Sequence, residues 1–244
     1  MTLLAVERIK LFSTRSPWWS MFLALGLTIG FAAMMALQSG PEFPLTLSMT
    51  QVGRQFGILV VLVMGVLTVT TEYRFGTIKA TFQAVPNRTA ALLAKTALIA
   101  VLALLIGETA AFGSWGVAQV VAPEADLAIT TSEQWRMLVG LGPIFAGSAV
   151  LALAVGVLIR QTAGAVTLVI AWSMLVEGLV GMIPTIGEDI QNWMPFMMAN
   201  HFLTGSAGDS SDMPLGPWGA LAYFVAIAVG MLIIALITAH RRDA

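Results

Sequence analysis

The chain contains no cysteine. This absence excludes disulfides, thiol chemistry and a zinc–thiolate site. Charged residues are also scarce, at 10% of 244 residues with a net charge of −1, against about 25% in a typical soluble domain. No basic surface of the kind that binds nucleic acid is expected. A GxxxxGK[ST] phosphate-binding loop is missing as well, so we expect that the chain is not an enzyme, hydrolyses no ATP alone and holds no cofactor.

The chain is instead rich in long apolar runs, since 58% of its residues are hydrophobic. Six runs stand out, at about 18–37, 50–71, 92–121, 137–159, 162–183 and 218–239. Each is close to or above the ~20 residues that a helix needs to cross a bilayer. They lack the period-2 alternation of barrel strands. The runs predict an all-α polytopic membrane protein with six spans, forming a single transmembrane domain over residues 1–244.

Lys and Arg are distributed unevenly between the two sides of these spans. If the loops alternate sides, the side of the N-terminus holds Arg8, Lys10, Arg15, Arg74, Lys79, Arg88, Lys95, Arg160, Arg241 and Arg242. The opposite side holds only Arg54 and Arg136. By the positive-inside rule, both termini are predicted to be cytoplasmic. The first run is too long for a typical signal-peptide core, so we expect it to be retained as a span.

The segment before the first span, residues 2–16, mixes apolar and charged residues. Leu3, Leu4, Ile9, Leu11 and Phe12 alternate with charges of both signs. This pattern favours a helix lying flat in the inner membrane interface, broken at Pro17 and followed by two tryptophans that suit the headgroup level. The alternative is a basic tail that only sets the topology.

The loop after the second span, about residues 72–86, is too polar to cross the membrane. Phe75, Ile78 and Phe82 recur at three- and four-residue spacing, which indicates one apolar stripe on a short helix. Such a helix suits docking into a cleft on a cytosolic partner. The residues expected to make this contact are Glu72, Tyr73, Arg74, Phe75, Gly76, Thr77, Ile78, Lys79 and Phe82. The alternative is a helix that rests on the lipid surface.

Three ionisable residues lie inside the predicted spans, namely Arg54, Glu108 and Glu177. Such residues are costly in lipid and need partners. At 1.5 Å per residue from the inner helix ends, all three lie about 20–25 Å deep, which places them in one outer layer. An Arg54–Glu108 pair is geometrically possible. The layer could hold helices together or line an outer vestibule, and the sequence leaves both open.

Two further features are an apolar segment on the outer side and the only two histidines of the chain. The apolar segment at about 190–204 is too short to span, so we expect it to lie in the outer interface or to re-enter the membrane. His201 and His240 fall on opposite sides of the membrane, so we expect no metal site.

Residues 72–81 read E-Y-R-F-G-T-I-K-A-T and residues 85–88 read V-P-N-R. This stretch resembles actinobacterial permease subunits of the type-2 ATP-binding-cassette exporter family. Residues 7–19 and the six-span plan are similar to the same group. The resemblance implies an interfacial helix at 2–16, a coupling helix at about 72–86 that contacts an ATPase, and a bacterial plasma-membrane location.

The resemblance also implies partners. Two cytosolic ATPase subunits, which would hold ATP and Mg²⁺, would pair with this chain and a second permease copy or sister permease. The substrate, an amphipathic drug-like molecule, lipid or peptide, would leave the cell by alternating access. One alternative is a stand-alone secondary transporter or channel, although no paired broken helices are evident. A less favoured alternative is an intramembrane enzyme, although no HExxH or Ser–His signature lies at membrane depth.

Overall fold

A computed structural model describes residues 3–78, 83, 87–205 and 213–242 of the chain. Within these ranges the regular elements are helices, and no strand is formed. The helices in chain order are α1 (Leu3–Ser13), α2 (Arg15–Gln38), α3 (Leu47–Thr50), α4 (Arg54–Arg74), α6 (Arg88–Val121), α7 (Ser132–Val139), α8 (Leu141–Ile159), α9 (Thr162–Ala171), a π-helix (Trp172–Val176), α10 (Glu177–Gly181), α11 (Gly187–Asn192), α12 (Pro195–Thr204) and α13 (Pro217–Arg242).

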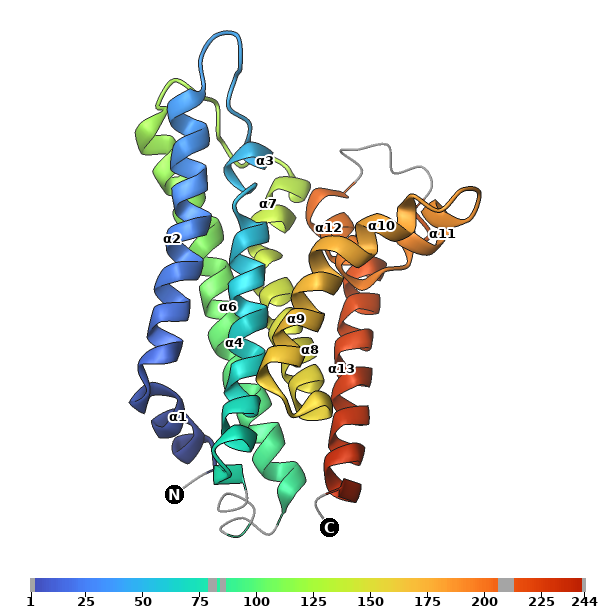
Figure 1. Ribbon diagram of the computed structural model, residues 1–244. Coiled ribbons are helices and arrows are strands. Elements are labelled where there is room, and N and C mark those ends of the chain that lie inside the picture. Colours follow the sequence, from blue (N-terminus) through green and yellow to red (C-terminus); the bar gives the residue numbers. More distant parts are fainter. Residues whose placement is uncertain (1–2, 79–82, 84–86, 206–212, 243–244) are drawn as a thin grey trace.

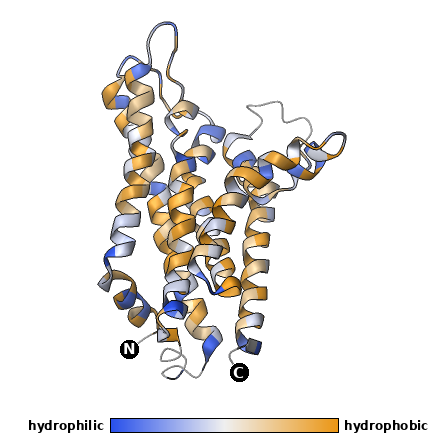
Figure 2. Ribbon diagram, viewed as in Figure 1, coloured by the Kyte–Doolittle hydropathy of each residue, from blue (hydrophilic) through white to orange (hydrophobic). Residues whose placement is uncertain are grey.

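Six stretches of helix are long and apolar enough to cross a membrane, which confirms the predicted helical architecture with six span-length helices and is compatible with a multi-pass membrane protein. They are Arg15–Gln38, Leu47–Arg74, Arg88–Val121, Ser132–Ile159, Thr162–Gly181 and Pro217–Arg241. Figure 2 shows their bodies as mostly hydrophobic, with hydrophilic residues gathered toward the ends. In Figure 1, α1 and the end of α13 lie at the same end of the bundle, as an even number of spans requires. We call this the terminal end and the opposite one the distal end.

The most buried span contains α8, which packs against α4, α6 and α13. Glycines allow its close approach to α4. A Cβ on Gly65 would lie 2.7 Å from the backbone oxygen of Ala149, and a Cβ on Gly156 would lie 2.7 Å from a methyl carbon of Val69. Small residues serve this purpose in membrane helix pairs because dispersion contacts, rather than the hydrophobic effect, hold such helices together.

The N-terminal segment forms a short separate helix, α1, as the sequence predicts, but the break lies earlier than Pro17. Thr14 has extended backbone angles and precedes the first residue of α2. Pro17 falls in the first turn of α2, where its missing N–H loses no helical hydrogen bond. The chain therefore bends before the proline. The adjacent Trp18 and Trp19 are exposed.

Candidate functional site

Four charged side chains from three helices meet at the terminal end. Lys95 of α6 donates hydrogen bonds to Glu7 Oε2 on α1 and, at 2.8 Å, to Glu72 Oε1 at the end of α4. Lys10 lies one turn from Glu7 and donates to its Oε1 at 3.1 Å. It also lies 3.7 Å from Glu72 Oε1. We call these four residues the Lys95 cluster. Its two carboxylates and two ammonium groups balance in charge.

The cluster forms because Lys95 has little access to water. Its side chain is 5% exposed, and it lies about two turns into α6 among Leu92, Ala94 and Ile99, which are all buried. An ammonium group in such surroundings needs a counter-charge. Glu7 supplies one from α1, although it is the one buried residue of that helix. Glu72 supplies the other from the last turn of α4.

A cavity of about 940 Å³ adjoins the cluster. Its polar wall contains Glu7, Lys10, Glu72 and Lys95, and its apolar wall includes Leu67 and Leu98. The bend between α1 and α2 also lines it. Within the described part of the chain, Glu72 Oε2 is buried and has no hydrogen-bond partner. The cavity thus joins a long apolar surface to an incompletely satisfied carboxylate.

The structure places the expected partner-docking residues on several elements. Glu72, Tyr73 and Arg74 form the last turn of α4. The helix stops there because Gly76 takes a φ of 70°, the left-handed conformation that favours glycine after a helix end. Thr77 and Ile78 follow in helical conformation. Lys79 and Phe82 lie outside the described residues.

These placements change the expected docking face. Glu72 was expected to flank the face, but it points to Lys95 because that buried ammonium needs its charge. Phe75 is 72% exposed, whereas Ile78 is only 7% exposed. Arg74 lies over the Phe75 ring, with 5.5 Å from Cζ to the ring centre. Of the described apolar positions, only Phe75 therefore presents a large free surface. Tyr73 packs instead beneath Arg160, the residue that follows α8, with 5.0 Å from Arg160 Cζ to the centre of the Tyr73 ring.

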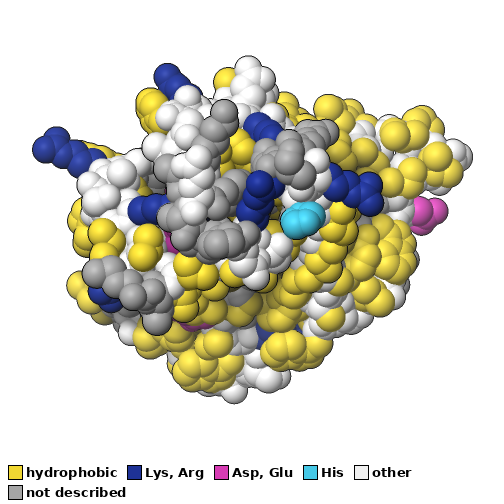
Figure 3. All heavy atoms as spheres, turned by 90° about the horizontal axis from the view of Figure 1, so that it is seen from below, with side chains coloured by type: hydrophobic (Ala, Val, Ile, Leu, Met, Phe, Trp, Pro, Cys, Tyr) yellow, Lys and Arg dark blue, Asp and Glu magenta, His cyan; other side chains and the backbone are white. Residues whose placement is uncertain are grey.

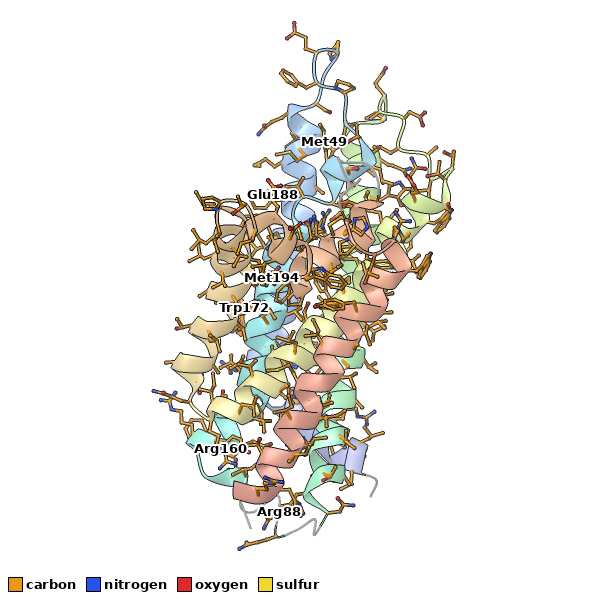
Figure 4. The ribbon with its side chains drawn as sticks, turned by 90° about the vertical axis from the view of Figure 1, so that its right-hand side faces the viewer. Met49, Arg88, Arg160, Trp172, Glu188 and Met194 are labelled. Carbon is orange, nitrogen blue, oxygen red and sulfur yellow. The ribbon has the colours of Figure 1, made fainter. Side chains whose placement is uncertain are left out.

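Figure 3 looks onto the terminal end and shows several Lys and Arg side chains on this face. Figure 4 labels Arg88 and Arg160 at the terminal end, and Met49 and Glu188 at the distal end. The unequal charge distribution found in the sequence is therefore present on the two ends of the folded bundle. Which end faces the cytoplasm remains a prediction of the positive-inside rule.

The predicted outer polar layer is divided among different partners. Arg54 Nη2 donates to Asn200 Oδ1 of α12 at 2.8 Å. Glu108 accepts a hydrogen bond from the backbone of Gly142 at the start of α8. No ion pair joins Arg54 and Glu108, both of which are described residues. The proposed pair is therefore absent, because each side chain has a nearer polar partner on another helix.

Glu177 holds the start of α12. Its Oε1 accepts from the backbone N–H of Phe196 at 3.0 Å, and its Oε2 accepts from that of Met197 at 2.8 Å. The indole Nε1 of Trp172 donates to Oε1 at 3.1 Å. The π-helix between Trp172 and Glu177 places the two on one side, since five residues make about one turn there.

Arg136 of α7 holds the other end of α12, because its Nε donates to the backbone oxygen of Phe202 at 2.8 Å. An anion at a helix N-terminus and a cation at its C-terminus both oppose the helix dipole. Arg54, Arg136 and Glu177 thus all bind α12, and we call these three charged residues the α12 clamp. The segment expected at about 190–204 consists of α11 and α12, each too short to span. This arrangement favours the structural role over the vestibule for Arg54 and Glu177.

The distal end has a second, shallower cavity of about 600 Å³. Trp172, Met194 and Trp193 line it together with Tyr223, whose hydroxyl donates to the backbone oxygen of Trp193 at 2.9 Å. Trp172 and Met194 lie close together in Figure 4. The Trp172 indole N–H and the Tyr223 hydroxyl, two polar groups of this cavity, thus both have partners within the protein.

The sequence reasoning missed the Lys95 cluster. Lys95 served only to count positive charges, and Glu7 only as part of the interfacial helix. A signal was present, because Glu7 and Glu72 are two of the few acids on the Lys-rich side. A lysine among apolar helical residues needs an acid, and these two were available at the same depth.

No protein-family model and no curated protein matches this chain. Among the described residues, no group of three or more His, Cys, Asp or Glu is arranged to hold a metal ion.

Proposed function

We propose that this chain is the permease subunit of an ATP-binding-cassette exporter. In this proposal the six spans pair with a second permease, and two cytosolic ATPases supply ATP and Mg²⁺. An amphipathic substrate leaves the cell as the pair switches between inward- and outward-facing states. The resemblance at residues 72–88 and the six span-length helices support the proposal.

One observation carries the proposal furthest. Glu72 begins the motif that resembles the family, and in the fold it is bonded to Lys95 of α6, which is bonded in turn to Glu7 of α1. A partner that moved the loop after α4 would therefore pull on α4, α6 and α1 together.

The proposal is tested by gentle purification from the native membrane. The expected result is an ATPase subunit that co-purifies at one copy per permease, with ATP hydrolysis that depends on the complex. A matched pair of variants sharpens the result. Arg74→Glu reverses an exposed charge beside Phe75 and should weaken ATPase recovery, whereas Glu188→Gln at the distal end should not. Purification without an ATPase, together with transport driven by an ion gradient, would favour the stand-alone transporter.

A further inference from the structure

We infer that the cavity beside the Lys95 cluster binds a single-chain amphiphile whose head is an ammonium group carrying N–H donors. As a binding site the cavity stands independently of the proposed function. Only the view that its ligand is the exported substrate rests on that function.

The polar wall selects the head group. Lys95 already donates to Glu7 and to Glu72 Oε1, and Lys10 donates to Glu7. Within the Lys95 cluster, whose four residues are all described, the buried side-chain atom that lacks a partner is an acceptor, Glu72 Oε2. A buried acceptor without a donor is unfavourable, so a ligand gains most by supplying an N–H. An ionised carboxylate or a fully ionised phosphate has no donor to offer this acceptor.

The apolar wall of the cavity favours an alkyl chain as the rest of the ligand. Met64, Leu67, Leu98 and Ile99 face the cavity from α4 and α6. The volume of about 940 Å³ lies within the usual range for small-molecule pockets, about 300–1,000 Å³. A flexible alkyl chain fits such a lining because it needs no further polar partners.

The position of the cavity indicates the route of access. Ser13, Thr14, Ser16 and Pro17 line it at the bend between α1 and α2, next to the exposed Trp18 and Trp19. Exposed tryptophans at a helix end are typical of the headgroup level. A ligand dissolved in the adjacent leaflet could therefore place its head at the cluster and its chain along α4 and α6.

The same ammonium chemistry could come from a free amphiphilic amine or from a bilayer aminophospholipid. The test begins in phosphatidylcholine nanodiscs, whose lipid head has no N–H donor. The probe is dodecylamine with a photoreactive diazirine on its chain, and labelled peptides are mapped by mass spectrometry. We expect labels on α4 and α6 next to the cavity.

Three unlabelled competitors of equal chain length define the head group. Dodecylamine should compete about tenfold or more better than dodecyltrimethylammonium, which has charge but no N–H, as expected for one hydrogen bond to a charged acceptor. It should also compete better than dodecanol, whose O–H donates a hydrogen bond but carries no charge. Equal competition by all three would overturn the proposal. Adding phosphatidylethanolamine tests the lipid source: a loss of labelling assigns the site to the lipid, and unchanged labelling assigns it to the free amine.

Variants locate the site. Glu72→Gln replaces the free acceptor with an amide and should lower labelling about tenfold. Leu67→Trp fills the apolar part and should remove labelling while the Lys95 cluster stays intact, which keeps the test valid if Glu72→Gln fails to fold. Trp193→Ala, in the distal cavity, should leave labelling unchanged. Unchanged labelling in both Glu72→Gln and Leu67→Trp would overturn the site. None of these measurements needs an ATPase, so failure of the exporter proposal would be seen separately.

Discussion

The two ends of the bundle bury charged side chains in different ways. At the distal end, Glu177 and Arg136 bind backbone groups at the two ends of α12. At the terminal end, Lys95 binds the side chains of Glu7 and Glu72. The distal partners belong to one rigid helix. The Lys95 cluster joins three separate helices, α1, α4 and α6, and a cavity adjoins it.

The α12 clamp therefore fixes one helix in place, whereas the Lys95 cluster links three helices that can move relative to one another. Backbone groups at a helix end stay in place while the helix exists, so the α12 clamp has one arrangement. An ion pair between helices persists only while the helices keep their positions. The Lys95 cluster therefore depends on where α1 lies, and it would respond to movement of the loop after α4. The following predictions test this contrast, beginning with the largest expected effect.

The first prediction concerns which end faces the cytoplasm, where the expected outcome is all or none. Single cysteines are introduced into this cysteine-free chain at two exposed positions, Glu188 and Thr89, the latter next to Arg88 in the first turn of α6. Figure 4 labels Arg88 and Glu188 at opposite ends. Because the positive-inside rule places the terminal end in the cytoplasm, an impermeant thiol reagent should label Glu188→Cys in intact cells and should label Thr89→Cys only after lysis. Labelling of Thr89→Cys in intact cells would reverse the orientation.

The second prediction concerns the stability of the terminal end. Lys95→Met leaves two buried carboxylates without their shared partner and should destabilise the protein by about 3–5 kcal/mol. Lys10→Met is the matched control, because its side chain is 38% exposed and its loss should cost less than about 1 kcal/mol. Thermal unfolding in detergent measures both. Equal losses of stability in the two variants would show that the burial of a lysine does not determine how much it contributes to the stability of the cluster.

The third prediction concerns the α12 clamp. Glu177→Gln sets an amide against the helix N-terminus and should cost about 1.5–3 kcal/mol, the value of hydrogen bonds to a charged group. Hydrogen exchange of the Phe196 and Met197 amides should quicken, while that of α6 should not change. Glu188→Gln, at an exposed acid nearby, serves as the control. Unchanged exchange in α12 would show that packing alone holds that helix.

The fourth prediction concerns Phe75 as an anchor for the proposed ATPase. Phe75→Ala should weaken ATPase association by about 1–2 kcal/mol, because an exposed aromatic gains energy only when a partner covers it. Trp19→Ala, which removes another exposed aromatic at the terminal end, should leave association unchanged. Pull-down at equal permease levels measures both. Equal recovery of ATPase by Phe75→Ala and the wild type would remove Phe75 from the contact.

The smallest expected effect is the coupling between Arg54 and Glu108. Since the two side chains have separate partners, Arg54→Gln and Glu108→Gln should destabilise additively, to within about 0.3–0.5 kcal/mol. A double-mutant cycle by thermal unfolding measures this coupling. Recovery of stability in the double variant would instead show that the two charges interact.

The sequence alone determined the six spans and the side on which most charges lie. Apolar run length and charge are properties of each segment by itself, and the cost of placing a residue in lipid depends little on neighbouring helices. The short helices at the N-terminus and before the last span could be predicted for the same reason, although the break after α1 lies at Thr14 rather than at Pro17. The second span was predicted to end three residues before Arg74, where Gly76 in the left-handed conformation ends α4.

Only the tertiary structure decided the partners of the buried charges. Counting residues gave the depth of Arg54, Glu108 and Glu177, and it placed all three in one layer. Depth says nothing of the direction in which a side chain points around its helix axis, and that direction depends on how glycines and large side chains let the helices pack. For this reason Arg54 and Glu177 each bind α12, at different residues, while Glu108 binds the start of α8. The same packing brings Lys95 to Glu7, a residue 88 positions away in the chain.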